Sequence, residues 1–165
     1  MRKNARGFSL IELLIVVAII LIIAAIAIPN LLRSRIAANQ ASAVGSLRAL
    51  NTAEITYSST YNLGYSSQLS YLGPPAAGAT PISTAAGLVD SVLAGTTNAS
   101  SKSGYSFTYT PTTNATTGRT DTYTLNGEPS TVGTTGTNFY YTDQSGVIRQ
   151  NTTAAAGSTD SPLAG

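Results

Sequence analysis

The sequence predicts an α+β fold in which a long N-terminal helix, membrane-spanning in its first half, packs by its second half on a small antiparallel β-sheet of about four strands. Three observations carry this prediction. An apolar run occupies residues 8–28, and apolar residues then continue at helical spacing to about residue 61. Beyond residue 102, aromatic and hydroxyl side chains alternate with a period of two, which is typical of half-buried strands.

The apolar run at residues 8–28 has the length of a bilayer-spanning helix, at about 1.5 Å of rise per residue. Arg2, Lys3 and Arg6 precede it, and no acidic residue lies among them. Basic residues beside a membrane segment stay on the cytoplasmic side. We therefore expect one pass through the inner membrane, with the N-terminus in the cytoplasm and the rest of the chain exported.

Two alternatives compete with the membrane anchor. Ala25-Ile26-Ala27 fits the cleavage pattern of a secretory signal peptide, which would release a binding domain after Ala27. However, the run is longer than the usual apolar core of about 7–15 residues, and it carries Glu12 near its start. A helix that is apolar on every side can also be the core of a large soluble protein, but few strongly apolar segments follow. The anchor is favoured.

Glu12 is the unusual residue of this segment. A carboxylate within the bilayer costs about 2.5–3.5 kcal/mol even on the lenient insertion scale, so an acid in such a segment is expected to have a partner. The alternative is a Glu12 side chain that stays hydrated among the lipid headgroups. Pairing with a cation is the favoured interpretation, because a paired charge costs much less to bury than an isolated one.

The motif Gly7-Phe8-Ser9-Leu10-Ile11-Glu12, after a short basic leader and before an apolar run, resembles the class III signal sequence of bacterial type IV pilins and pseudopilins. The resemblance covers about the first third of the chain. It implies that a prepilin peptidase and N-methyltransferase cuts between Gly7 and Phe8 and methylates the new amine of Phe8. It also implies that Glu12 pairs with that amine on a neighbouring subunit.

The same resemblance implies a homopolymer, which inner-membrane assembly machinery with an ATPase builds into an extracellular pilus on the cell surface. A subunit of this kind would be a structural protein in the fibres used for motility, adhesion or secretion. A type II secretion pseudopilin or a minor pilin is the alternative within the family.

Pro29 interrupts the helical pattern. Proline lacks an N–H group and clashes with the preceding turn, so a kink is predicted near residues 25–29. The resemblance implies that this stretch loosens when the fibre forms or extends. Beyond Pro29 the apolar residues keep to one helical face: Leu32, Ile36, Ala43, Leu47, Leu50 and Tyr61. The helix is therefore expected to continue, from about Ser9 to about Thr60.

The predicted organisation has six parts. They are a cleaved leader (1–7), a transmembrane and filament-core helix (8–29), an amphipathic helix half (30–61), a connecting region with a short helix (62–102), an antiparallel sheet (103–151) and a tail (152–165). Ser83 or Thr84 is expected to cap the short helix, and Gly95 to end it. The tail is expected either to be mobile or to dock on a neighbouring subunit.

Two hairpins are predicted in the sheet region. Alternating residues at 105–109 and 123–125 flank a loop, and residues 138–142 and 147–150 flank the turn sequence Asp143-Gln144-Ser145-Gly146. The resemblance leads us to expect a disulfide near the C-terminus, but the chain has no cysteine. Its C-terminal end must therefore be held by sheet pairing and tyrosine packing.

Composition argues against an enzyme. The chain has no histidine, cysteine or tryptophan, which removes the usual general base, the thiol nucleophile and most transition-metal ligands. We expect no cofactor and no metal, although a calcium loop of the pseudopilin kind leaves Asp143 and Asp160 as an alternative. Without the leader, six basic and seven acidic side chains remain, and the globular part shows no basic patch for nucleic acid.

Overall fold

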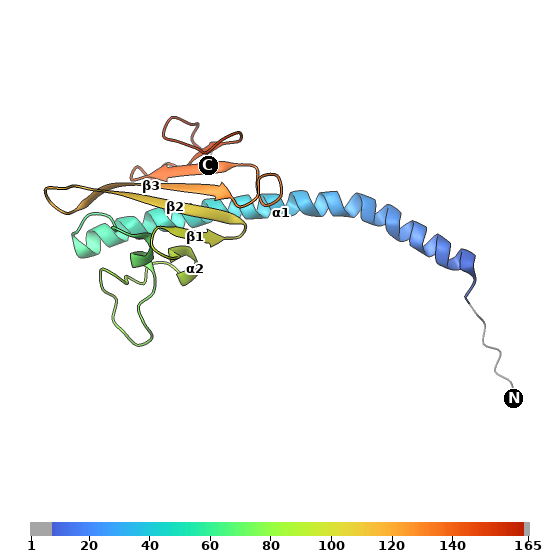
Figure 1. Cartoon of the computed structure of the whole chain (residues 1–165), viewed down its shortest axis with the longest axis horizontal. Helices are drawn as coiled ribbons and strands as arrows, with labels where there is room; N and C mark the ends of the chain where they lie inside the picture. The colour runs from blue at the N-terminus through green and yellow to red at the C-terminus, as the bar shows by residue number, and fades with distance from the viewer. Residues whose placement is uncertain (1–7, 164–165) are drawn as a thin grey trace. The chain divides into compact units, whose positions relative to one another are not determined.

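The computed structural model describes residues 8–163. Helix α1 runs from Leu10 to Tyr61 over 52 residues, which confirms the predicted long helix to within a residue at each end. The chain divides into two compact units, the first ending at Arg35 and the second running from Ile36 onward. The C-terminal half of α1 belongs to the second unit, where the β-sheet lies along it (Figure 1).

The second unit holds a five-stranded antiparallel sheet in which neighbours in sequence are neighbours in space. The strands are β1 (Ala99–Lys102), β2 (Tyr105–Thr113), β3 (Thr120–Pro129), β4 (Phe139–Asp143) and β5 (Arg149–Asn151). The α+β fold class is confirmed, with one strand more than expected. Both predicted hairpins are present, as β2–β3 and β4–β5.

Alternation in β2 decides which face of the sheet meets the helix. Tyr105, Phe107 and Tyr109 are buried, while the intervening hydroxyl residues are exposed. Tyr109 pairs with Leu125 on β3, whose side chain is fully buried. Strand residues with a period of two thus place one continuous apolar face on α1. The core consists mainly of Ala43, Leu47, Leu50, Ala53, Tyr57, Leu69, Leu72, Tyr105, Phe107, Tyr109, Tyr123, Leu125 and Tyr140.

Two expectations for the connecting region were wrong. Strand β1 lies inside it, because pairing with β2 orders the hydroxyl-rich segment Ala99–Lys102, which has no apolar alternation of its own. The short helix α2 spans only Ser91–Ala94, and its N-cap is Asp90, whose Oδ1 accepts the Leu93 N–H at 2.9 Å. A one-turn 3₁₀ helix, η1 (Leu69–Leu72), precedes it. Gly95 ends α2 as predicted.

The C-terminal tail docks on its own sheet as far as Leu163. The Leu163 N–H donates to the carbonyl of Ile148 at 2.7 Å, so the tail runs beside the edge of the sheet. Asp160 fastens the loop that precedes this contact: its Oδ1 accepts from Asn151 Nδ2 at 3.0 Å and its Oδ2 from the Gly157 N–H at 2.8 Å. Arg149 donates to the Asp160 carbonyl at 2.8 Å. These bonds close the C-terminal loop without a disulfide.

Replacing Asp160 by alanine is expected to destabilise the globular unit by about 1–3 kcal/mol, because two N–H donors lose a charged acceptor. The measurement is urea unfolding of the full chain in detergent. Glu128→Ala is the control, since Glu128 is an exposed acid on β3, and surface substitutions usually change stability by less than about 0.5 kcal/mol. Equal stability of the two variants would show that Asp160 does not hold the tail.

Candidate functional site

The N-terminal turn of α1 carries the residues that the sequence singled out. Phe8 is 82% exposed, and Glu12 lies in the first helical turn with its side chain in solvent. Gly7, the other residue of the predicted cleavage site, lies outside the described residues. An exposed aromatic residue followed by an acid four positions later thus stands at the start of the helix.

Glu12 has a local partner that sequence reasoning missed. Its Oε2 accepts the backbone N–H of Ser9 at 2.9 Å, while the Ser9 carbonyl accepts the Leu13 N–H at 3.3 Å. This is the reach-back half of a capping box, and the spacing Ser-x-x-Glu was the signal that could have revealed it. The carboxylate also lies at the positive end of the helix dipole. In the isolated chain Glu12 therefore stabilises the first turn of its own helix.

The rest of this segment is an apolar helix with no polar face. The described residues contain one helix that is long and apolar enough to cross a membrane, and none of its most apolar window is buried. Burying one such side chain is worth about 1.5–3 kcal/mol relative to water. Burying the whole apolar surface of this segment would therefore stabilise the protein by an amount on the order of tens of kcal/mol. Its large apolar side chains are Leu10, Ile11, Leu13, Leu14, Ile15, Val16, Val17, Ile19, Ile20, Leu21, Ile22, Ile23, Ile26 and Ile28.

Pro29 lies inside α1, and the helix is continuous on both sides of it. Because proline has no N–H group, the carbonyl of Ala25 lacks its usual helical hydrogen-bond donor. This is the weakest point of the backbone ladder within the apolar segment. A kink at Pro29 remains a prediction.

A second acid, Glu54, is buried in the hydrophobic core between α1 and the sheet. Its side chain is fully buried on the face of α1 that meets the sheet. Its Oε2 accepts the Ser66 N–H at 2.8 Å and its Oε1 accepts the Ser66 hydroxyl at 2.6 Å. The Tyr109 hydroxyl donates to the Ser66 carbonyl at 2.7 Å. Glu54 thereby links α1 to the segment that follows the helix. Its position four residues after Leu50 and three before Tyr57, on the buried face of the helix, could have predicted its burial from the sequence.

Burial raises the pKa of the Glu54 carboxyl above its usual 4.5, and the hydrogen bonds from Ser66 oppose this rise only in part. Desolvation also raises the pKa of Tyr109, and the nearby Glu54 charge adds to the effect. Burial likewise raises the pKa of Tyr105 to about 12. These tyrosines are therefore neutral hydrogen-bond donors at any physiological pH.

The described residues do not bring acids together as a metal site. No group of three or more histidine, cysteine, aspartate or glutamate residues within residues 8–163 is placed to hold an ion. Asp143 and Asp160, the candidates for calcium, use their carboxylates differently: Asp143 accepts the Ser145 N–H at 2.9 Å, and both oxygens of Asp160 accept N–H groups. Oxygens aimed at N–H donors are not arranged for a cation.

Comparison with known proteins finds similarity in the N-terminal segment of the chain. The model of the prokaryotic N-terminal methylation motif matches residues 2–28. The type IV major pilin protein PilA of Myxococcus xanthus is 54% identical over 52 residues, which cover 32% of this chain and 24% of that protein. The type IV wide pilus major component PilA4 of Thermus thermophilus is 68% identical over 37 residues, which cover 22% of this chain and 28% of that protein.

These matches span only about a quarter of the relatives' lengths. No solved structure is significantly similar to the chain. A long N-terminal helix with a methylation motif, packed by its second half on an antiparallel sheet, defines the pilin class of α+β proteins. The N-terminal helix of the chain is similar to that of type IV major pilins.

Proposed function

We propose that the chain is the major structural subunit of an extracellular type IV pilus-like filament. The observation that carries this proposal is the unpartnered apolar helix: none of its most apolar window is buried by the rest of the chain. Such a surface is stable either in lipid or among like helices, and transfer between the two costs little because lipid tails are as apolar as leucine. The two relatives are major components of their pili by name.

In this proposal the precursor crosses the inner membrane once, and prepilin peptidase cuts between Gly7 and Phe8 and methylates the Phe8 amine. Glu12 then accepts this amine from a neighbouring subunit within the filament core. Exchange of its capping bond with Ser9 for a full ionic partner lowers the cost of burying the carboxylate. Pro29 loosens the helix where subunits pack, and an ATPase-driven machine lifts subunits from the membrane to the cell surface.

The experiment that tests the proposal is mass spectrometry of filaments sheared from cells that express the chain. The expected N-terminus is Phe8, heavier by one methyl group, and the subunit should dominate the sheared fraction. An N-terminus at Ile28 would instead identify a secreted domain released after Ala27. A processed chain that is scarce in the fibres would identify a minor pilin or pseudopilin and contradict the proposal of a major subunit.

A further inference from the structure

Three acceptor patterns for N-linked glycans, Asn-x-Ser/Thr, lie in the second compact unit and take no part in the proposed function. They begin at Asn98, Asn114 and Asn151. Such a pattern can be modified on the surface of a folded, exported protein, where the asparagine amide and the hydroxyl two residues later are both accessible. The pattern also recurs by chance in threonine-rich sequence, so accessibility in the fold decides among the three.

The pattern at Asn98 is closed by packing. The hydroxyl of Ser100, two residues later, is buried and has no hydrogen-bond partner within residues 8–163. Asn98 is occupied as well: its Oδ1 accepts the Leu69 N–H at 3.1 Å, and its carbonyl accepts the Tyr109 N–H at 2.9 Å. A transferase cannot reach the Ser100 hydroxyl in the folded chain.

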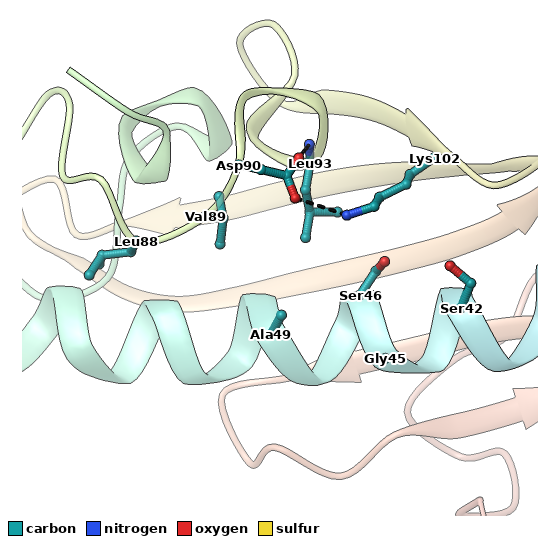
Figure 2. A pocket seen from close by; sticks show the side chains of 9 residues that line it. All are labelled: Ser42, Gly45, Ser46, Ala49, Leu88, Val89, Asp90, Leu93 and Lys102. Carbon is teal, nitrogen blue, oxygen red and sulfur yellow. Dashed lines mark hydrogen bonds and ion pairs between the residues drawn. The ribbon is translucent and has the colours of Figure 1, made fainter. Parts of the chain in front are cut away.

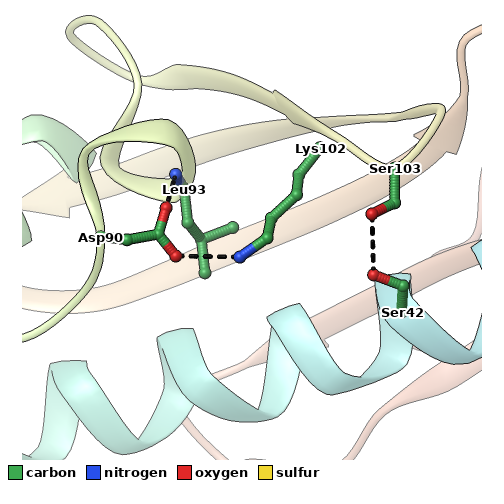
Figure 3. A network of polar contacts seen from close by, with 5 residues as sticks. All are labelled: Ser42, Asp90, Leu93, Lys102 and Ser103. Carbon is green, nitrogen blue, oxygen red and sulfur yellow. Dashed lines mark hydrogen bonds and ion pairs between the residues drawn. The ribbon is translucent and has the colours of Figure 1, made fainter.

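Strand β1, which carries this pattern, is also fastened at its far end. Lys102 Nζ and Asp90 Oδ2 form an ion pair at 2.8 Å, while the other Asp90 oxygen caps α2 (Figure 3). The Ser42 hydroxyl donates to that of Ser103 at 3.0 Å and joins α1 to the β1–β2 turn. The ion pair lies in the lining of a cavity of about 500 Å³ beside Gly45 (Figure 2). These contacts hold β1 in place and keep the hydroxyl of its second residue buried.

The pattern at Asn151 is used to hold the C-terminal tail. Asn151 Nδ2, the atom that would carry a glycan, donates to Asp160 Oδ1 at 3.0 Å. The Thr153 hydroxyl donates to Asn151 Oδ1 at 3.0 Å, and the Thr153 N–H donates to the same oxygen at 2.9 Å. Asn151 is half-buried at the end of β5. A glycan on this nitrogen would crowd the loop at Asp160, so the docked tail opposes modification here.

The pattern at Asn114 is open. It lies at the tip of the β2–β3 hairpin, where every residue from 112 to 119 is exposed. Asn114 Oδ1 accepts the Thr116 N–H at 2.9 Å, in a turn that holds the amide group beside the exposed Thr116. Asn114 Nδ2 donates to Oδ2 of the exposed Asp121 at 3.1 Å. Because this bond lies at the surface, water can take its place when the amide reacts.

We propose that Asn114 is the N-glycosylation site of the exported chain, with a lipid-linked oligosaccharide as the sugar donor. In this reaction Asn114 Nδ2 forms a bond to C1 of the first sugar, while the bond from C1 to the pyrophosphate oxygen breaks. The lipid pyrophosphate leaves with the electron pair, and one Nδ2 proton passes to solvent. The site rests on the proposed function only in needing an exported globular unit, and it does not need the filament.

Mass spectrometry of the full chain from the cells that make it naturally tests this site. The chain is taken both from membranes and from the sheared fraction, and its peptides are sequenced. The peptide that contains Asn114 is expected to be heavier by one or more sugar residues. Asn114→Gln should lose this added mass completely. The matched controls Asn98→Gln and Asn151→Gln should keep it.

The hydroxyl requirement gives a second, independent pair of variants. Thr116→Ser keeps the acceptor pattern and should keep the added mass, whereas Thr116→Ala removes the pattern and should lose it although Asn114 is unchanged. The side chains of Asn114 and Thr116 are exposed, so the melting temperature of each variant in detergent should stay close to that of the unaltered chain.

Two kinds of result would overturn the site. One is an Asn114 peptide of unmodified mass in the unaltered chain. The other is added mass that persists in Asn114→Gln or lies only on Asn98, Asn151 or a hydroxyl side chain. Because the membrane fraction is analysed too, the two proposals fail separately: modified Asn114 without filaments contradicts the filament subunit alone, and filaments of unmodified chain contradict the glycosylation site alone.

Discussion

Replacing Glu12 by alanine is expected to abolish filaments while the protein still accumulates in the membrane. In the proposed filament the substitution leaves the methylated amine of Phe8 buried without a counter-charge. Removing one partner of a buried ion pair costs about 3–5 kcal/mol, which corresponds to a loss of roughly 10²- to 4 × 10³-fold in the incorporation of each subunit. The measurement is the amount of sheared filament per cell, normalised to total subunit by immunoblot.

Glu12→Gln separates charge pairing from helix capping. The glutamine amide oxygen can still accept the Ser9 N–H that Glu12 Oε2 accepts at 2.9 Å, but it carries no charge. Filament loss in both variants supports pairing with the amine of a neighbour. Normal filaments from Glu12→Gln would show that the residue acts only as a cap on its own helix. The mass of each variant establishes that cleavage after Gly7 still occurs.

Glu54→Gln is expected to stabilise the globular unit at neutral pH by about 1–3 kcal/mol. A buried ionised carboxylate without a cation is costly, and Glu54 is fully buried in the chain. Glutamine has the same shape, accepts the Ser66 N–H, and donates to the Ser66 hydroxyl that now donates to Glu54. The measurement is urea unfolding of the full chain in detergent, followed by the near-ultraviolet circular dichroism of the buried tyrosines.

The pH dependence of this difference has a defined sign. Burial raises the Glu54 pKa above its usual 4.5 in the folded chain, so the folded state binds the proton more tightly than the unfolded state. The contribution of Glu54 to stability is therefore complete below pH 4.5 and is lost as the pH rises through the raised pKa. The advantage of Glu54→Gln should accordingly shrink on acidification. A difference that stays constant with pH would show that Glu54 is not the titrating group.

Glu54→Ala is the third member of this series. It leaves the Ser66 N–H and hydroxyl buried without an acceptor and opens a cavity, so it is expected to destabilise the unit by about 2–4 kcal/mol at any pH. Opposite effects of the glutamine and alanine variants would identify the hydrogen bonds, and not the charge, as the stabilising element. If glutamine destabilised as much as alanine, ionised Glu54 would instead be an essential partner of Ser66.

Much of the architecture follows from periodicity. The apolar run and the stripe after it predict α1 to within a residue at each end, because a helix of that length repeats its signal many times. The alternation around Tyr105 and Tyr109 predicts the β2–β3 pair for the same reason. Strand β1 was missed, since its four residues carry no apolar alternation and are ordered only by hydrogen bonds to β2.

The candidate site likewise contains features that the sequence predicts and features that only the structure shows. Phe8, Glu12 and Pro29 are local features, whose chemistry can be read from neighbouring residues in the chain. The capping bond of Glu12 is local too, and its Ser-x-x-Glu spacing was available in the sequence. The hydrogen bonds of Asp160 and the cavity of about 500 Å³ beside Gly45 of α1 are not local. They join residues from separate elements whose side chains carry no shared pattern.

The sequence by itself determined the membrane-length helix, the motif at its start and the class of fold, because each is written in the order and spacing of neighbouring residues. Only the tertiary structure decided that Glu54 is buried, that the tail docks on the sheet, and that a cavity opens beside Gly45. Burial and cavities depend on which distant segments meet. Those long-range contacts depend on packing across the whole unit, and no local sequence pattern predicts them.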